Sequence, residues 1–491
     1  MFASQALEAA GSWHAILVAT ALLGELLAVV FVYRVLVRGG APASTLLWMV
    51  VILAAPWLGL LLYYLLPRRL QLRRLRRVRQ RSERLREARS AHGATATVPV
   101  PTNGRTAPCV PGLAALLAGD SGEDLVAGNE LHWLAGGREF STRAEAAINA
   151  AAHKVDCVVY IFRPDTAGLL FLEVLTRAAQ RGVRVRLLFD AIGSFGLKNA
   201  HLAALRAAGG RAEAFLPLLW KRRPFTMNLR NHRKYLIVDG AVGFVGGRNV
   251  GDEYFTDRIG QQREWLDAML EIRGPAVARL QDVFAEDWCT ATDEVPAAAS
   301  VPAPPVPGGA AVGIVCSGPD REQPELWFAI VQAIGDAART VELSSPYLVP
   351  PPTLMFALQL AVARGVRVRI YTNGPKAEAA VLYHAQRSYY ARLIDAGIEL
   401  YETVREYNHA KLLVVDERTV LVGSANMDLR SAHLNFEIAA VAHDAPGLAA
   451  AVLATIEQRR AAFRRITLAD LPESPFWRVV DALAGLLSPL L

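Results

Sequence analysis

Two long apolar runs, at residues 15–36 and 46–66, open the chain and precede the shorter alternating patterns of the remainder. A helix needs about 20 apolar residues to cross the hydrocarbon core of a bilayer, and each run reaches that length. The segment between the runs holds Gly39 and Pro42, which favour a tight turn. The pattern predicts a two-helix transmembrane hairpin within residues 1–66.

Two other interpretations of these runs stay open. One is a buried hairpin of a soluble protein, and the other is a cleaved signal peptide. Ala41-Pro42-Ala43 resembles a cleavage site. However, the first sixteen residues contain no Lys or Arg, and the apolar region is longer than that of a signal peptide. These features favour the transmembrane hairpin.

A strongly basic segment follows the second run directly. Residues 68–81 are mostly arginine, with leucines at helical spacing. Positive charge beside a membrane span stays on the cytoplasmic side, so the rest of the chain is expected to be cytoplasmic. Residues 67–112 are therefore predicted to form a basic juxtamembrane helix, able to lie on anionic lipid, and a linker. A topology signal without further function is the alternative.

The remaining chain has two blocks, 113–293 and 313–491, separated by a Pro/Ala-rich linker at 294–312. In each block short apolar strands alternate with helical runs, which is typical of α/β layers with a largely parallel sheet. Both blocks contain Arg-Gly-Val-Arg-Val-Arg, at 181–186 and at 364–369. The shared order of parts predicts two homologous domains.

A polar motif occurs once in each block, and this duplication carries most of the functional information. Both copies read His-x-Lys, four residues, Asp, six residues, and then Gly-[Gly/Ser]-x-Asn. The first copy contains His232, Lys234, Asp239 and Asn249, and the second contains His409, Lys411, Asp416, Ser424 and Asn426. Residues two apart on a strand share a face, so each His projects together with its Lys. The odd spacing of each Asp from its His indicates a structural position away from that face.

Two histidines and two lysines suit chemistry on a tetrahedral phosphate. One histidine can attack phosphorus covalently, while the other protonates the leaving alkoxide and later deprotonates the incoming alcohol. The lysines can neutralise the phosphate oxygens, as a metal would otherwise do. A neutral imidazole needs a carboxylate to fix its tautomer. Asp267 and Glu437 are the candidates, and Asn249, Ser424 and Asn426 are candidate phosphate-binding donors.

Charge and cysteine usage narrow the possible partners. The net charge of +7 suits nucleic acid or anionic lipid. The strongest basic run, residues 68–81, is tethered within a few residues of the predicted membrane span, which disfavours nucleic acid as its partner. The four cysteines form no C-x-x-C pair and none lies near a His at zinc-ligand spacing, so no disulfide framework or structural zinc is expected.

The doubled motif closely resembles the signature of the phospholipase D superfamily, and the wider sequence is similar to the bacterial cardiolipin synthases. The resemblance implies two phospholipase D-like α-β-α sandwich domains, preceded here by the hairpin. It implies that His232 and His409 are the catalytic pair, with His232 as the nucleophile, and that neither a metal nor another cofactor is needed. It also places Lys234, Lys411, Asp239 and Asp416 in the catalytic motif.

The same resemblance implies a multi-pass enzyme of the bacterial inner membrane with cytoplasmic catalytic domains. Its expected reaction joins two phosphatidylglycerol molecules into cardiolipin and glycerol through a phosphatidyl-histidine. A hydrolase with water as acceptor, a membrane-tethered nuclease and a non-catalytic scaffold are the alternatives. A C-terminal amphipathic helix is expected to lie on anionic phospholipid or to pack on the body; its apolar residues are Phe476, Trp477, Val480, Leu483 and Leu487.

Overall fold

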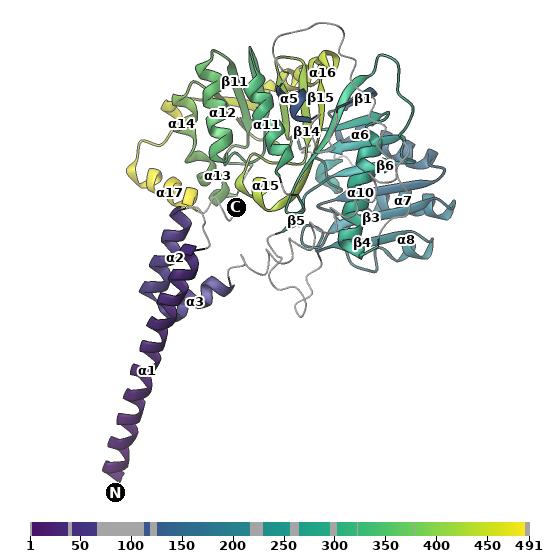
Figure 1. Cartoon of the computed structure of the whole chain (residues 1–491). Helices are drawn as coiled ribbons and strands as arrows, with labels where there is room; N and C mark the ends of the chain where they lie inside the picture. Colours follow the sequence, from purple (N-terminus) through teal and green to yellow (C-terminus); the bar gives the residue numbers. More distant parts are fainter. Residues whose placement is uncertain are drawn as a thin grey trace. The chain divides into compact units, whose positions relative to one another are not determined.

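A computed structural model describes most of the 491-residue chain (Figure 1). The described residues are 2–37, 42–65, 112–117, 125–216, 229–255, 265–294, 302–321, 323–377 and 379–486. The predicted basic helix, nearly all of the segment that follows it, and part of the Pro/Ala-rich linker lie outside these ranges. The chain divides into two compact units, a small one that includes residues 1–76 and a large one that holds the catalytic blocks.

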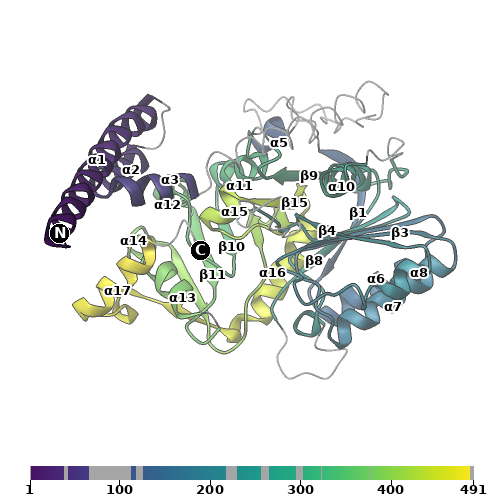
Figure 2. The same cartoon turned by 90° about the horizontal axis from the view of Figure 1, so that it is seen from below.

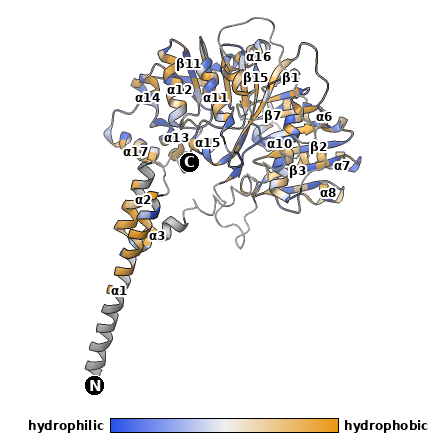
Figure 3. Cartoon of the chain, viewed as in Figure 1, coloured by the Kyte–Doolittle hydropathy of each residue, from blue (hydrophilic) through white to orange (hydrophobic). Residues whose placement is uncertain are grey.

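The small unit is helical. It contains α1 (Phe2–Val37), α2 (Pro42–Ala54) and α3 (Pro56–Leu65), and proline begins α3 because its ring is tolerated in the first turn of a helix. A small apolar core joins them through Ala28 and Phe31 of α1, Ile52 of α2 and Leu60 of α3. Figure 3 shows how strongly apolar these helices are. Within the described residues, no helix combines the length and apolar character that a membrane crossing requires.

The large unit contains two halves of similar construction. The first half comprises β1 (Val126–Leu134), α6 (Gly137–Ala150), β2 (Lys154–Val159), α7 (Thr166–Gln180), β3 (Arg184–Asp190), α8 (Ala203–Ala207), β4 (Arg211–Phe215), β5 (Arg230–Asn231), β6 (Tyr235–Val238), β7 (Val242–Gly246), β8 (Met269–Arg273) and α10 (Val277–Thr292). The second comprises β9 (Ala310–Ser317), α11 (Glu325–Asp336), β10 (Thr340–Ser344), α12 (Pro352–Ala363), β11 (Arg367–Thr372), α13 (Ala380–Arg387), α14 (Tyr390–Asp395), β12 (Glu399–Thr403), β13 (Leu412–Val415), β14 (Thr419–Gly423), α15 (Leu429–His433), β15 (Asn435–His443), α16 (Pro446–Gln458), β16 (Phe463–Ile466) and α17 (Pro475–Leu486).

The described strands form one continuous 16-stranded sheet across both halves. Its order is β16-β12-β11-β10-β13-β14-β15-β9-β1-β8-β7-β6-β2-β3-β4, with β5 paired to β15. The halves meet at the antiparallel pair β1 and β9. On either side of this join the strands follow the same order, so β15 corresponds to β8, β13 to β6 and β10 to β2.

The mixed α/β class is confirmed, but the expectation of a largely parallel sheet is wrong. Within each half, parallel pairing is confined to the outer strands: β2 pairs with β3 and β3 with β4 in one half, and β10 pairs with β11 and β11 with β12 in the other. The central strands are antiparallel, and a tight turn joins two of them in each half, β6 to β7 and β13 to β14. Between β6 and β7, Asp239 and Gly240 have φ values of 51° and 70°, which suit the two central residues of a hairpin turn.

Helices cover both faces of the sheet, as Figure 2 shows for the first half, where α10 lies opposite α6, α7 and α8. Their apolar faces form one core beneath α6 and α7 and another beneath α11 and α12. The short helix α5 (Gly112–Leu117) precedes the first half in sequence, yet Leu113 and Leu117 belong to the core of the second. These cores fix the strands whose ends carry the polar motifs.

Candidate active site

Backbone hydrogen bonds cross between the halves where the two polar motifs meet. Arg230 and Asn231 of β5 pair in parallel with Asn435 and Phe436 of β15, and the backbone N–H of His232 donates to the Phe436 carbonyl at 3.0 Å. The second motif repeats this arrangement. Asn408 forms a parallel bridge with Leu266, and the His409 N–H donates to the Leu266 carbonyl at 2.8 Å.

These crossings place each histidine beside a carboxylate of the opposite half. His232 Nδ1 lies 3.0 Å from Glu437 Oε1, and His409 Nδ1 lies 2.6 Å from Asp267 Oδ2. Glu437 and Asp267 immediately follow Phe436 and Leu266, the residues that accept the histidine N–H groups. The structure therefore brings together the two histidines and both carboxylates named from the sequence, and it adds the exchange of partners between halves.

Both histidines are almost fully buried, and their surroundings favour the neutral imidazole. Burial lowers the pKa of His232 to about 4, against the attraction of Glu437, and the charge of Lys234 lowers it further. Burial and the charge of Lys411 lower the pKa of His409 to about 3, with Asp267 opposing. A neutral ring that donates through Nδ1 carries its lone pair on Nε2, the nitrogen that nucleophilic attack requires.

The two carboxylates are ionised in the same site. Burial alone raises the pKa of a carboxyl group, but His409, Lys411 and Arg248 outweigh it and lower the pKa of Asp267. His232, Lys234 and the Ser424 hydroxyl do the same for Glu437. An ionised carboxylate only accepts hydrogen bonds, so each histidine must present its Nδ1–H to it.

Each lysine folds back onto the backbone of its own motif. Lys234 Nζ donates to the His232 carbonyl at 2.6 Å, and Lys411 Nζ donates to the His409 carbonyl at 2.5 Å. Burial is the main cause that lowers the pKa of Lys411 to about 8, and it lowers the pKa of Lys234 well below its usual range. The lysine of each half also lowers the pKa of the histidine of the other, so the four side chains form a single electrostatic site.

The predicted phosphate-binding residues have unequal surroundings. Asn249 accepts from the Ile161 N–H at 3.0 Å and donates to the Tyr254 hydroxyl at 2.9 Å. Ser424 donates to Glu437 and accepts from the Ile438 N–H at 3.0 Å. Asn426 Oδ1, by contrast, is buried without a hydrogen-bond partner in the described part of the chain. Their contacts with phosphate stay a prediction.

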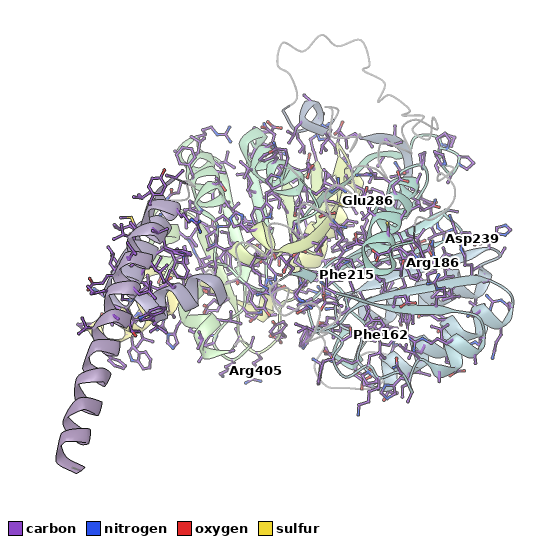
Figure 4. The ribbon with its side chains drawn as sticks, turned by 60° about the horizontal axis from the view of Figure 1, so that its bottom comes forward. Phe162, Arg186, Phe215, Asp239, Glu286 and Arg405 are labelled. Carbon is purple, nitrogen blue, oxygen red and sulfur yellow. The ribbon has the colours of Figure 1, made fainter. Side chains whose placement is uncertain are left out.

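The two motif aspartates lie at the far ends of β6 and β13 from the histidines. Asp239 accepts backbone N–H groups of Ala152, His153 and Lys154 at 2.7–2.8 Å, and Figure 4 shows it at the outer side of the first half. Asp416 accepts the equivalent groups of residues 338–340 at 2.7–2.8 Å. Both side chains tie a strand end to the loop before a neighbouring strand, so their contacts are structural rather than catalytic.

Two buried arginines, not assigned to the site from the sequence, hold the backbone of the orienting carboxylates. Arg233 Nε donates to the Glu437 carbonyl at 3.1 Å, and Arg248 Nη2 donates to the Asp267 carbonyl at 2.9 Å. Both are residues of the first motif, in the variable positions of His-x-Lys and Gly-Gly-x-Asn. The second motif has Ala410 and Ala425 there. This Arg/Ala difference is visible in the sequence and could have indicated a special role.

Comparison with known protein families shows which family contains this chain. The family model described as "Cardiolipin synthase, PLD-like domain" matches residues 145–288 and 330–464, which together exceed half of the chain. The chain belongs to the cardiolipin synthase family. It is 34% identical over 467 residues to a cardiolipin synthase of Geobacillus thermodenitrificans, covering 92% of this chain and 89% of that one. It is 33% identical over 371 residues to "Major cardiolipin synthase ClsA" of Bacillus subtilis, covering 74% and 76%.

The fold comparison agrees with this assignment. A crystal structure of phosphatidylserine synthase from Haemophilus influenzae superposes with a TM-score of 0.59 at 16% identity, covering 74% of this chain and 95% of that one. At this identity the match supports the fold alone. The resemblance to the phospholipase D superfamily drawn from the doubled motif is confirmed, and the chain is a phosphatidyltransferase of that superfamily.

Proposed function

We propose that this chain condenses two phosphatidylglycerol molecules into cardiolipin and glycerol through a covalent phosphatidyl-histidine. The crossed His232–Glu437 and His409–Asp267 pairs carry the proposal, because they supply two imidazoles, each oriented by a carboxylate, in one cationic site. Two such bases suit a double displacement, in which one nitrogen bonds to phosphorus while the other transfers protons.

In the first step, His232 Nε2 attacks the phosphorus of one phosphatidylglycerol. The bond from phosphorus to the headgroup glycerol oxygen breaks, and this oxygen takes a proton from Nε2 of His409. His409 must therefore enter this step protonated on both ring nitrogens, a state that the anionic phosphate bound beside it would favour. Lys234 and Lys411 neutralise the phosphate oxygens as charge moves onto them. Glu437 holds His232 in the attacking tautomer and stabilises the positive ring that results.

In the second step, His409 removes a proton from a headgroup hydroxyl of the second phosphatidylglycerol. That oxygen attacks phosphorus, the bond from phosphorus to His232 breaks, and cardiolipin leaves. Asp267 stabilises the protonated form of His409, which exists before the first step and again after the second; between the steps His409 is neutral and can act as a base. The second step reverses the proton transfer of the first, so the site returns to its starting state after each turnover.

We also propose that residues 1–66 anchor the enzyme in the bacterial inner membrane as a two-helix hairpin, with the catalytic halves in the cytoplasm. The small unit supports this by exposing large apolar side chains of α1, with Leu22, Leu26 and Val29 each 62–63% exposed. Such side chains suit contact with lipid tails. Extraction of membranes with alkaline carbonate should leave the protein in the pellet, and its release into the supernatant would argue against the hairpin.

The proposed reaction is tested with labelled phosphatidylglycerol in membranes carrying the protein, without divalent metal. The expected products are cardiolipin and free glycerol in equal amounts. Phosphatidic acid alone would identify a hydrolase with water as acceptor. Absence of any lipid turnover, together with cleavage of a nucleic-acid phosphodiester, would support a nuclease.

A further inference from the structure

The last helix, α17, packs on the body through a charged residue and turns most of its large apolar side chains toward the outside. Asp481 and Ala484 are buried, at 7% and 8% exposure. Large apolar side chains face outward instead, and these are Phe476, Val479, Leu483 and Leu486 at 66%, 56%, 58% and 75% exposure. A helix at the surface of a soluble domain normally buries its apolar stripe and exposes its charges.

Polar contacts with α13 hold α17 in this orientation. Asp481 Oδ1 lies 2.7 Å from His384 Nδ1, and Arg387 donates to both Asp481 oxygens at 2.8 and 2.9 Å. The Trp477 ring stacks on His384 with an interplanar angle of 4°. Gly485 packs so closely that a Cβ there would lie 2.7 Å from Ser388 Oγ. The outward turn of the apolar side chains is therefore fixed by a specific interface.

The exposed side chains form one stripe. Phe476, Val479, Leu483 and Leu486 are spaced by three, four and three residues, which places them on a single face of the helix. Arg478 is also exposed but lies on another side of the helix. Figure 3 shows α17 with both hydrophobic and hydrophilic residues. We name the four apolar residues the outer stripe of α17.

The geometry points to a phospholipid bilayer as the surface that covers the outer stripe. A second copy of the chain fits less well, because a 12-residue helix is about 18 Å long and its stripe falls far short of the roughly 800 Å² that each partner buries in a stable dimer. A bilayer accepts a short stripe, and Trp477 and Arg478 beside it suit the headgroup level.

This inference rests on the proposed function, since a phosphatidylglycerol substrate resides in a bilayer. It assigns to α17 the task of holding the catalytic halves against the lipid surface. Because Asp481 bonds to α13 and not to a lipid, the helix is expected to stay docked on the body while its stripe enters the interface.

The test uses the full chain with Cys109 replaced by serine, since Cys157, Cys289 and Cys316 are buried. A fluorophore is attached at Leu483→Cys, and Arg478→Cys provides a matched control on another side of the same helix. In vesicles containing phosphatidylglycerol, nitroxide lipids labelled in the acyl chain should quench the probe at position 483 strongly. The probe at 478 should instead be quenched by iodide in the buffer.

Three results would overturn the inference. Iodide quenching at 483 in vesicles would show that the stripe faces water. Shielding from both quenchers, also in detergent, would show that another part of this chain covers the stripe. Shielding that depends on protein concentration would show a second copy. None of these results requires turnover, so each is separable from failure of the proposed reaction, which would appear as absence of cardiolipin with the unaltered chain.

Activity supplies a second readout. The double variant Phe476→Ser/Leu483→Ser should lower turnover of vesicle phosphatidylglycerol about tenfold, chiefly through KM, because less apolar area enters the interface. With short-chain phosphatidylglycerol dispersed as monomers, the same variant should match the unaltered enzyme. An equal loss on both substrates would indicate a structural role for the stripe and contradict docking.

Discussion

The first and second motifs have the same arrangement at the histidines but differ around them. In both, the His backbone pairs with the opposite half and the ring contacts a carboxylate from that half. Around this common part, the first motif supplies Arg233 and Arg248, whereas the second supplies Ala410 and Ala425. We expect the proposed chemistry to depend on what the halves share. The differences show how one half supports the backbone of both carboxylates.

The supporting contacts also differ in kind. Arg233 lies in a buried ionic cluster, where Nη1 donates to Asp287 at 2.6 Å and Tyr235 donates to the same carboxylate at 2.8 Å. Arg248 reaches carbonyl groups instead, those of Tyr254, Ala135 and Asp267. Phe215 of the first half also packs edge-on against Phe436, the residue before Glu437, at a centroid distance of 5.1 Å, and Figure 4 labels it near the middle of the body.

The largest effects are expected from the shared part. His232→Ala and His409→Ala should each lower cardiolipin formation at least about 10³-fold, because each removes either covalent attack or proton transfer. Circular dichroism and thermal unfolding should show that both variants fold. Substantial turnover by either variant would contradict the two-histidine mechanism.

The orienting carboxylates come next. Glu437→Gln and Asp267→Asn should each lower kcat about 10²-fold or more, because an amide no longer enforces the Nδ1–H tautomer. If Glu437 acts through His232 of the other half, the double variant His232→Ala/Glu437→Gln should have nearly the same kcat as His232→Ala alone. Both substitutions would then disable the same histidine–carboxylate pair. Independent, multiplicative losses for that pair would show that Glu437 does not act through His232.

The arginine difference should give an intermediate effect. The double variant Arg233→Met/Asp287→Asn removes this ion pair as a unit, and Asp320, the other carboxylate beside Arg233, still lies 3.9 Å from Arg321. The variant should lower kcat about tenfold by loosening the Glu437 backbone. The matched control is Arg321→Met/Glu286→Gln, which removes another ion pair of the same buried cluster, 3.2 Å long, and leaves the hydrogen bond from Arg233 to the Glu437 carbonyl in place. A similar activity loss in the control would reduce the role of Arg233 to general stability.

The dependence of activity on pH tests the lysine of the second motif. Because the pKa of Lys411 is lowered to about 8, kcat/KM should fall as pH rises through 8 and that lysine loses its proton. Lys411→Arg retains a cation and should move this alkaline limb upward, though with a lower maximal rate. An alkaline limb that does not move in Lys411→Arg would assign the titration to another group.

The smallest effect on turnover is expected from the motif aspartates. Asp239→Ala and Asp416→Ala each remove an acceptor of three backbone N–H groups and should lower the free energy of unfolding by about 2 kcal/mol. Activity per folded molecule should stay within about twofold of the unaltered enzyme. Asp→Asn should cost less, because Asn tolerates the left-handed φ of 51° and 52° at these positions. A large loss of kcat in an Asn variant that is as stable as the unaltered enzyme would show that these aspartates take part in catalysis.

The proposed reacting groups could be named from the sequence, but the pairing of each histidine with its carboxylate could not. A motif that occurs twice identifies the histidines and lysines, and two isolated carboxylates stand out as orienting candidates. Which carboxylate serves which histidine depends on the parallel pairing of β5 with β15 and of Asn408 with Leu266. These contacts join residues about 140 to 205 positions apart, and no local pattern reports them.

The pairing of strands in the sheet also depends on contacts between distant residues, which the sequence pattern does not report. Alternation of strands and helices predicts α/β layers, and this holds for β2–β4 and β10–β12. It does not predict that the central strands of both halves pair antiparallel, or that β1 and β9 join both halves into one sheet. The polarity of α17 was likewise open, because an apolar stripe fits both a membrane and a packed core until the burial of Asp481 decides its direction.

The most direct test of the crossed double-displacement site is to locate the covalent intermediate. The unaltered enzyme is mixed with phosphatidylglycerol labelled at phosphorus, denatured within seconds in alkali, where a phosphohistidine survives, and digested. The label should be found on the peptide containing His232 and should be absent in His232→Ala. Label on His409, or cardiolipin formation with no labelled histidine at any time, would contradict the account.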